Sequence, residues 1–206
     1  MTAVAIIDYG LGNLGSVRRA FTDIGADVTI LSNPDGLGLA THLVLPGVGA
    51  FADGMAQLHA GGWVDALRSQ VMEHHKPVLG ICLGMQLLAT EGTEGGLTPG
   101  LDLIPGKVSR LDQMGCKSRV PHVGWNDIQI RQPDSVLMRG ISDGTDFYFV
   151  HSFACQPDQA AHIVATCNYD IDVVAVIQNG CVMGTQFHPE KSSRAGFHLL
   201  KNFLNA

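Results

Sequence analysis

Short apolar runs alternate with helix-forming segments from residue 3 to residue 90, and this alternation constrains the fold more than any other feature of the sequence. Runs of aliphatic and β-branched residues are typical of buried strands, whereas the segments between them carry apolar residues at helical spacing. Parallel strands need crossover helices, which then cover the faces of the sheet. We therefore expect an α/β fold with a mostly parallel central sheet flanked by helices. The expected strands are Ala3–Asp8, Asp27–Leu31, His42–Leu45 and Pro77–Ile81, and the expected helices are about Leu14–Ile24, Ala56–Leu58 and Trp63–Met72.

The second half of the chain has a different pattern of apolar and polar residues, which is typical of strands. A glycine-rich stretch, Glu91–Gly100, predicts a loop, and short alternating segments follow it. Gln178-Asn179-Gly180 predicts a hairpin turn between the last two of these segments, and Phe197–Leu204 predicts a closing helix. We expect the new strands, some of them antiparallel, to extend the same sheet, so that residues 1–206 form a single domain. They are Lys107–Leu111, Asn126–Arg131, Phe147–His151, Ile163–Cys167, Val173–Ile177 and Cys181–Thr185.

Composition argues against several classes of function. With 206 residues and a net charge of −6, the chain can bury one core but has no basic cluster for nucleic acid. No apolar run reaches the roughly 20 residues that cross a bilayer, and no basic segment precedes the first strand. We therefore expect neither a membrane segment nor a signal peptide. Five cysteines without a CxxC pair argue against a disulfide framework and favour the cytoplasm. The nine histidines show no recurring ligand spacing, so we expect no metal and no cofactor.

A cysteine occupies the corner between the fourth expected strand and a helix-forming series. The segment Gly80-Ile81-Cys82-Leu83-Gly84 has the pattern G-x-C-x-G, a nucleophile elbow with sulfur in place of a serine hydroxyl. The glycines permit a tight turn, and the start of a helix favours the thiolate. The backbone N–H of Leu83 is free at the helix start and points to where an oxyanion would form. The alternative is a buried structural cysteine, which is the commoner role of a lone free cysteine.

A second reactive group lies far along the chain, in His188-Pro189-Glu190. Proline keeps the residue before it extended, and residues i and i+2 of an extended chain project to the same side. His188 and Glu190 can therefore pair, with the carboxylate orienting the imidazole. Together with Cys82 they have the composition of a Cys–His–Glu triad, in which the histidine is the general base. For this tripeptide alone, the alternative is a solvent-exposed strand end.

Two glycine-containing loops precede the elbow. Pro46-Gly47-Val48-Gly49 can present backbone N–H groups in a concave nest, or it can be a plain tight turn. The segment from Gly10 to Gly15 reads G-x-G-x-x-G after a strand, which is the dinucleotide fingerprint. That fingerprint requires an acidic residue at the end of the second strand, where this chain has Leu31-Ser32-Asn33. A nucleotide-binding module at residues 10–15 stays an alternative, and a tight packing turn is the simpler interpretation.

In combination, these motifs resemble those of the class I, triad-type glutamine amidotransferases. GICLGMQ around Cys82, FHPE at 187–190 and P-G-x-G at 46–49 carry the resemblance. Further segments resemble one branch, the glutaminase subunits of imidazole glycerol phosphate synthase in histidine biosynthesis. These segments are DYGLGN at 8–13, PGVGAF at 46–51, PHVGWN at 121–126, YFVHSF at 148–153 and HPEKS at 188–192. The resemblance covers essentially the whole chain and implies a flavodoxin-like amidotransferase fold.

The resemblance implies a reaction and a role for each matching residue. Cys82 would attack the side-chain amide of L-glutamine to form a thioester. His188 would protonate the departing ammonia and later activate water, and Glu190 would orient His188. The backbone N–H groups of Leu83 and Val48 would form the oxyanion hole. Glutamine would be held by Gly47, Gly49, Gln86, His151, Ser152 and Phe153, and the residues that would face a partner are Asn13, Trp125, Asn126 and Lys191.

The implied partner is a (β/α)8-barrel cyclase, which would form a heterodimer with this chain. It would use the ammonia to make imidazole glycerol phosphate and aminoimidazole carboxamide ribotide. One residue departs from the wider family, because many relatives have glycine where this chain has Val48. A β-branched residue restricts the backbone, so we hypothesise that the Gly47–Val48 peptide needs the partner to turn its N–H toward the oxyanion. A free-standing cysteine hydrolase acting on esters or γ-glutamyl peptides is the remaining alternative.

Overall fold

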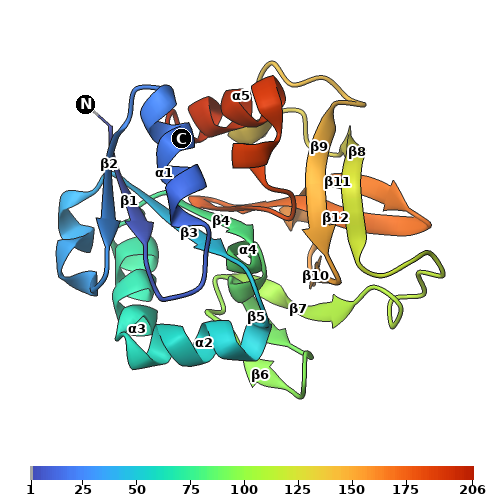
Figure 1. Ribbon diagram of the computed structural model, residues 1–206, viewed down its shortest axis with the longest axis horizontal. Helices are drawn as coiled ribbons and strands as arrows, with labels where there is room; N and C mark the ends of the chain where they lie inside the picture. Colours follow the sequence, from blue (N-terminus) through green and yellow to red (C-terminus); the bar gives the residue numbers. More distant parts are fainter. Residues whose placement is uncertain (1) are drawn as a thin grey trace.

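A nine-stranded sheet runs through the molecule, which the computed structural model describes from residue 2 to residue 206 (Figure 1). Its strand order is β2-β1-β3-β4-β13-β12-β11-β8-β9. The strands from β2 to β13 pair in parallel, and the pairings from β13 to β9 are antiparallel. The strands are β1 (Ala3–Ile7), β2 (Asp27–Leu31), β3 (His42–Gly47), β4 (Val78–Cys82), β8 (His122–Ile130), β9 (Asp146–His151), β11 (Ile163–Tyr169), β12 (Ile171–Asn179) and β13 (Val182–Thr185).

Helices cover both faces of the parallel strands, as the alternation predicts. Figure 1 shows α1 and α5 on one side, and α2, α3 and the short α4 on the other. Strand β1 is apolar throughout because both of its faces are buried. Val4 and Ile6 join one buried cluster, and Ala5 and Ile7 join the cluster on the opposite face. The helices are α1 (Leu14–Asp23), α2 (Phe51–Ala60), α3 (Trp63–Arg68), α4 (Leu83–Leu87) and α5 (Ser193–Phe203).

Strand β13 is the last strand in the chain, but it lies inside the sheet, between β4 and β12. It follows β12 through the predicted hairpin, in which Asn179 pairs with Val182 and Gly180 takes a positive φ of +56°. Its register with β4 places Thr185 opposite Ile81. The residues after Thr185 therefore emerge at the same sheet edge as the residue after Ile81, which is Cys82.

A second sheet departs from the sequence-based expectation. Strands β5 (Ala89–Gly92), β6 (Thr98–Pro99), β7 (Ile104–Arg110) and β10 (Phe153–Pro157) form a separate four-stranded sheet in the order β10-β7-β5-β6. The prediction of a loop over Glu91–Gly100 holds for residues 93–97 and was wrong for Glu91–Gly92 and Thr98–Pro99. The assignment of Lys107–Leu111 to the main sheet was also wrong, and β10 was not predicted. Two glycines explain this difference. A Cβ on Gly92 would lie 2.5 Å from the Phe51 ring, and one on Gly100 would lie 2.2 Å from the Ala89 carbonyl oxygen, so both serve close packing.

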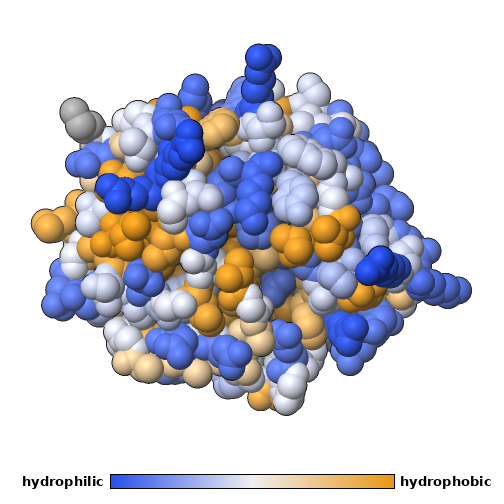
Figure 2. Space-filling model, viewed as in Figure 1, coloured by the Kyte–Doolittle hydropathy of each residue, from blue (hydrophilic) through white to orange (hydrophobic). Residues whose placement is uncertain are grey.

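The remaining elements follow the sequence closely, although two helices begin earlier than predicted, whereas α1 and α3 begin at the predicted residues. α2 begins at Phe51, and α5 begins at Ser193 in place of Phe197. α3 continues into a π-helical turn at Ser69–Glu73, and 3-10 turns cover Pro34–Leu39, Val136–Met138, Ala160–His162 and Pro189–Lys191. Within residues 2–206, no helix is long and apolar enough to cross a membrane. Figure 2 shows a band of apolar residues across the middle of one face, with polar side chains above and below it.

Candidate active site

Cys82 lies at the corner between β4 and α4, as the G-x-C-x-G pattern predicts. Its backbone has φ 55° and ψ −110°, a region that residues other than glycine rarely adopt. The unusual backbone conformation thus belongs to the cysteine and not to the glycines beside it. The two glycines allow neighbouring backbone segments to approach closely. A Cβ on Gly84 would lie 1.7 Å from the Leu45 carbonyl oxygen, and one on Gly80 would lie 2.6 Å from the Gly84 carbonyl oxygen. They let α4 pack tightly against β3 and β4, which holds Cys82 at the sheet edge.

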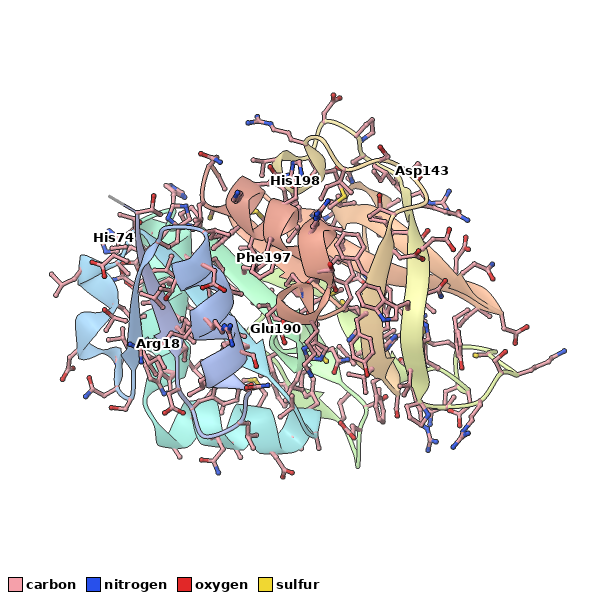
Figure 3. All side chains as sticks on the ribbon, turned by 45° about the horizontal axis from the view of Figure 1, so that its top comes forward. Arg18, His74, Asp143, Glu190, Phe197 and His198 are labelled. Atoms are coloured by element: carbon pink, nitrogen blue, oxygen red, sulfur yellow. The ribbon has the colours of Figure 1, made fainter. Side chains whose placement is uncertain are left out.

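His188 and Glu190 form the pair that the sequence predicts. His188 is extended, with φ −97° and ψ 97°, and its Nδ1 lies 2.8 Å from Glu190 Oε1. The local geometry differs from the expected strand, however, because Pro189–Lys191 forms a 3-10 turn that brings Glu190 back toward the ring. The Glu190 side chain is only 1% exposed. Figure 3 shows it toward the centre of the molecule, between α1 and α5.

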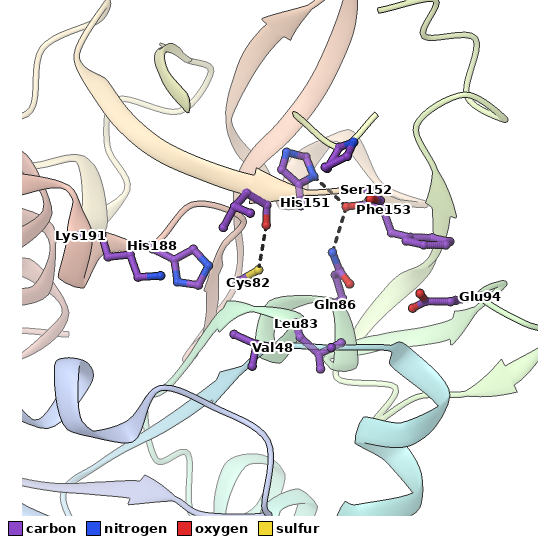
Figure 4. A pocket seen from close by; sticks show the side chains of 13 residues that line it. Val48, Cys82, Leu83, Gln86, Glu94, His151, Ser152, Phe153, His188 and Lys191 are labelled. Carbon is purple, nitrogen blue, oxygen red and sulfur yellow. Dashed lines mark hydrogen bonds between the residues drawn. The ribbon is translucent and has the colours of Figure 1, made fainter. Parts of the chain in front are cut away.

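The surroundings of His188 favour its protonated form. Burial lowers the pKa of His188, but the Cys82 and Glu190 side chains outweigh that effect and raise the pKa to about 9. The second ring nitrogen, Nε2, is buried and has no hydrogen-bond partner among residues 2–206, and the ring faces Cys82 (Figure 4). The Cys82 sulfur lies 3.8 Å from the Val150 carbonyl oxygen and 3.8 Å from Gln186 Nε2. A thiol and an imidazole that is hydrogen-bonded to a carboxylate can together perform nucleophilic catalysis.

Ser192 supports this pair, and the sequence analysis did not single it out. Its hydroxyl donates a hydrogen bond to the His188 carbonyl (2.6 Å) and accepts one from the Tyr148 N–H (3.0 Å). The His188 N–H in turn donates to the Tyr148 carbonyl (2.9 Å). These bonds tie the turn that carries His188 to strand β9. Only its place in the HPEKS segment could have indicated Ser192, because its partner Tyr148 is remote in sequence.

A cavity of about 370 Å³ opens beside Cys82, within the range of roughly 300–1,000 Å³ that is usual for small-molecule sites. In Figure 4, His188 lies at one side of Cys82, and Gln86 and Glu94 lie at the other. The cavity therefore extends away from the histidine. The residues that line it are Val48, Gly49, Cys82, Leu83, Gln86, Glu94, Pro121, Val150, His151, Ser152, Phe153, His188 and Lys191.

Two of the predicted substrate-binding side chains converge on one backbone group. The Phe153 carbonyl accepts hydrogen bonds from Gln86 Nε2 (2.9 Å) and from His151 Nδ1 (2.8 Å). Gln86 Nε2 also donates to Gln186 Oε1 (3.0 Å), so both of its N–H groups are occupied. The orientation of the Gln86 amide is therefore fixed by the protein before any ligand binds.

The Pro46–Gly49 loop forms the wall opposite β9. A Cβ on Gly47 would lie 2.3 Å from the Tyr9 hydroxyl, and Gly49 has a φ of +108°, so both positions require glycine. Val48 lies between them on the cavity wall with 43% of its surface exposed. Gly47 itself does not line the cavity but packs beneath it. The roles of Leu83 and Val48 as oxyanion donors stay predictions.

Comparison with known proteins assigns the family. The chain matches the family described as glutamine amidotransferase class-I over residues 5–206. The chain belongs to the class I glutamine amidotransferase family. It is 49% identical over 203 residues to the imidazole glycerol phosphate synthase subunit HisH of Moorella thermoacetica, covering 98% of this chain and 94% of that protein. It is 47% identical over 206 residues to the HisH subunit of Methanosarcina acetivorans, covering 99% and 98%.

Solved structures confirm the fold of this amidotransferase. A structure described as PurLQS from Thermotoga maritima matches with a TM-score of 0.78 at 17% identity, covering 99% of this chain and 98% of that one. A structure described as a glutamine amidotransferase matches with a TM-score of 0.77 at 19% identity, covering 98% and 97%. At such identities the likeness concerns the fold, and it agrees with the predicted flavodoxin-like α/β architecture.

Glu94 is a second residue of the amidotransferase site that the sequence analysis did not single out. It lies between β5 and β6, and its Oε2 accepts a hydrogen bond from the Phe51 N–H at the start of α2 (2.8 Å). This bond fixes the carboxylate at the end of the cavity remote from His188 (Figure 4). The only signal in the sequence is an acidic residue inside a glycine-rich stretch, and such a stretch by itself predicts a loop.

Each of the four residues predicted to face a partner also has contacts within the chain. Trp125 is 55% exposed and packs against Tyr148, with 6.1 Å between ring centroids. Lys191 Nζ lies 6.0 Å from the centre of the same Tyr148 ring. Asn126 instead points to the other side of β8, where it bonds to the Asn168 carbonyl (2.9 Å). Asn13 caps α1, accepting a hydrogen bond from the Ser16 N–H (3.3 Å). Trp125 and Lys191 thus form a common surface, and the other two side chains have partners within the chain.

The dinucleotide-like loop at residues 10–15 has a local structural role. Gly10 has a φ of +90°, and its N–H donates to Asp8 Oδ1 (3.1 Å). A Cβ on Gly12 would lie 3.5 Å from Leu14, so the loop packs against the start of α1. None of residues 10–15 lines the cavity beside Cys82. Within residues 2–206, no group of three or more His, Cys, Asp or Glu side chains is arranged to hold a metal ion.

Proposed function

We propose that the chain is the glutaminase subunit of imidazole glycerol phosphate synthase, an enzyme of histidine biosynthesis. It hydrolyses L-glutamine to L-glutamate and ammonia. One observation carries the proposal: Cys82, held on a strained turn, faces a histidine–carboxylate pair at the mouth of a small cavity. The near-full-length identity to HisH subunits supports the choice of synthase. The family match to residues 5–206 supports a single glutaminase domain.

In the proposed mechanism, the Cys82 thiolate attacks the side-chain carboxamide carbon of glutamine. The oxygen of the tetrahedral intermediate is stabilised by the N–H groups of Leu83 and Val48, each worth about 2.7–4 kcal/mol in comparable sites. The carbon–nitrogen bond breaks as His188 donates its proton to the departing ammonia, which leaves a γ-glutamyl thioester. His188 then takes a proton from water, which attacks the thioester and releases glutamate. Glu190 keeps the imidazole in place through both steps.

The opposite end of the cavity fits the amino-acid part of glutamine. Glu94 provides a carboxylate that can pair with the α-ammonium group, since it is held by a single backbone N–H and lines the cavity. Gln86, His151, Ser152 and Phe153 lie between Glu94 and Cys82 and would contact the rest of the substrate. Gly47 supports the site from below by letting the loop approach Tyr9. The reacting carboxamide is thereby directed at the thiol.

A partner is part of the proposal. The ammonia passes to a (β/α)8-barrel cyclase in a heterodimer, which forms imidazole glycerol phosphate and aminoimidazole carboxamide ribotide. Trp125 and Lys191 both lie against Tyr148, and Lys191 and the exposed Val48 line the cavity, so we propose that these three residues face the cyclase together with Asn13 and Asn126. All five cysteines are free thiols, which fits a reducing compartment such as the cytoplasm.

The decisive experiment replaces the nucleophile in the complex with the cyclase. We expect Cys82→Ala to abolish glutamine-dependent synthesis while synthesis from added ammonium salt persists. Cys181→Ala is the matched control, since Cys181 lies at the β12–β13 turn, and it should retain both activities. Loss of both activities in Cys82→Ala, or no loss at all, would contradict the assignment.

The same preparation tests whether the partner sets the oxyanion hole. If the Gly47–Val48 peptide depends on the cyclase, the isolated chain will hydrolyse glutamine slowly and the liganded complex will hydrolyse it much faster. Full glutaminase activity in the isolated chain would contradict this gating. Turnover of esters without any partner would instead favour the free-standing cysteine hydrolase.

A further inference from the structure

Two buried histidines connect the cavity to the interior side of β8. His151 lines the cavity, and its Nε2 lies 3.0 Å from His122 Nδ1. His122 Nε2 lies 3.3 Å from Asn126 Nδ2, which also donates to the Asn168 carbonyl (2.9 Å). At the other end, His151 Nδ1 lies 2.8 Å from the Phe153 carbonyl oxygen. Both histidines are almost fully buried, at 3% and 6% exposure for His122 and His151. The contact between the two rings is therefore shielded from solvent, whereas the end formed by Asn126 and Asn168 lies at the surface.

The hydrogen-bond partners of the two histidines determine which of their ring nitrogens carry protons. The Phe153 carbonyl can only accept, so His151 Nδ1 is the donor and its Nε2 is the acceptor. His122 Nδ1 must then donate to His151, and His122 Nε2 accepts from the Asn126 amide. Both rings are neutral in this arrangement. Burial agrees, since it lowers the pKa of His122 to about 4 and that of His151 to about 3.

The ring of His122 is held rigidly by aromatic neighbours. It stacks on Tyr169 with 4.0 Å between centroids and an interplanar angle of 21°. On its other side it stacks on Phe149, at 4.9 Å and 19°. A ring fixed on both faces presents its two nitrogens in one direction only. The donor from His122 to His151 is therefore preorganised.

The series of hydrogen bonds from His122 through His151 reaches the proposed substrate site at the Phe153 carbonyl. It accepts from His151 and from Gln86, whose amide lies on the cavity wall. Building on the proposed function, we propose that His122 is a positioning residue for glutamine binding. Acting through His151, it holds the Phe153 carbonyl and with it the Gln86 amide in the orientation that receives the substrate. His122 does not line the cavity, so its effect is indirect.

His122 lies on strand β8, and the opposite face of the same strand is exposed. Side chains on a strand alternate between faces, and β8 places His122 and Asn126 inward while Trp125 is 55% exposed. A protein that docks on Trp125 would therefore contact the strand that carries His122.

The test uses three substitutions of His122 in the complex with the cyclase, assayed for glutamine hydrolysis. His122→Phe keeps an aromatic ring between Phe149 and Tyr169 but removes both nitrogens. His122→Asn keeps a donor near the Nδ1 position, whereas His122→Gln moves the amide toward the Nε2 position. We expect His122→Phe to raise KM for glutamine about tenfold, equivalent to about 1.4 kcal/mol, with kcat changed less than about twofold. His122→Asn should restore KM and His122→Gln should not.

The outcomes separate this proposal from the function on which it rests. If the wild-type complex does not hydrolyse glutamine, the proposed function fails. If the wild type is active and a folded His122→Phe variant keeps the wild-type KM, the proposal that His122 positions the glutamine site fails. Equal KM values for His122→Asn and His122→Gln would also overturn it, and this comparison holds even where the Phe variant does not fold. A fall in kcat at constant KM would contradict a role in positioning the substrate.

Discussion

At the scale of single residues, the site depends on a cysteine held in a backbone conformation that costs roughly 1–3 kcal/mol. Cys82 has a φ of 55°, and the surrounding structure must supply the compensation. It does so through backbone-to-backbone packing, because Gly84 lies directly against the Leu45 carbonyl and Gly80 lies against Gly84. The glycines of the motif therefore allow α4 to pack closely against β3 and β4, which holds Cys82 in place.

This view predicts that a single methyl group will disturb the fold. Gly84→Ala places a Cβ 1.7 Å from the Leu45 carbonyl oxygen, so we expect a loss of at least about 3 kcal/mol in the free energy of unfolding. Gly15→Ala, in helix α1 with open space around it, is the matched control and should stabilise the protein by about 0.5 kcal/mol. Urea unfolding measures both. A Gly84→Ala variant as stable as wild type would show that α4 can shift freely.

At the scale of elements, the short turn after β13 carries the histidine and the carboxylate. Its geometry is secured by Ser192, which bonds to the His188 carbonyl and to the Tyr148 N–H and is 1% exposed. Neither bond involves the substrate or the reacting atoms. The turn is therefore fixed by strand β9, while the thiol is fixed by β4 and α4.

Removing this tie should lower turnover without weakening substrate binding. Ser192→Ala leaves the Tyr148 N–H without its partner, at about 1–3 kcal/mol, and removes one of the two hydrogen bonds that the His188 carbonyl accepts, the other coming from the Lys191 N–H. We expect kcat to fall about tenfold while KM for glutamine changes less than about twofold. Ser193→Ala is the matched control, since the Ser193 side chain is exposed. Steady-state kinetics and thermal melting together check the prediction, and an unchanged kcat in a folded Ser192→Ala variant would refute it.

The parallel half of the sheet could be predicted from sequence almost residue by residue. Strands β1, β3 and β4 are buried on both faces, and each is a nearly continuous apolar run. The edge strand β2 is only partly buried and mixes polar with apolar residues, and it still matches its predicted bounds, Asp27–Leu31. The second sheet could not be predicted, because β5 is Ala-Thr-Glu-Gly and β6 is Thr-Pro, with neither an apolar run nor an alternating pattern. These strands are specified by their packing partners, which are remote in sequence.

The site divides in the same way. Cys82, His188 and Glu190 lie in short motifs whose chemistry is local, and the sequence indicated all three. The pairing of His188 with Glu190 was right although the reason was incomplete, since a 3-10 turn and not a strand brings them together. Glu94, Ser192 and His122 act through contacts with residues far along the chain. Spacing in one sequence carries no information about such contacts.

At the scale of the whole molecule, stability should depend on pH through three buried histidines. His188 has a pKa of about 9, above the ordinary 6.5, so its contribution is complete below about pH 6.5 and is lost as the pH rises through 9. His122 and His151 have pKa values of about 4 and about 3. The unfolded chain therefore binds protons at these residues before the folded chain does, and their contribution is lost as the pH falls below 6.5.

We expect the free energy of unfolding to be greatest at about pH 6–7 and to decrease on both sides. Urea unfolding between pH 5 and pH 9.5 at constant ionic strength measures the curve. Glu190→Gln removes a group that raises the His188 pKa, so it should flatten the alkaline side and leave the acid side unchanged. A free energy of unfolding that rises steadily across the whole pH range would contradict the proposed loss of the His188 contribution at alkaline pH.

The place of β13 in the sheet has a consequence for the growing polypeptide on the ribosome. Until residues 182–185 have been synthesised, β4 has no neighbour on one side, and all five of its residues, Val78–Cys82, are apolar or glycine and buried in the finished fold. An unpaired apolar strand is a template for aggregation. The nascent chain must therefore protect this edge until late in translation. Until then it also carries the Cys82 thiol without His188 and Glu190, so under the proposed mechanism an incomplete chain does not release ammonia.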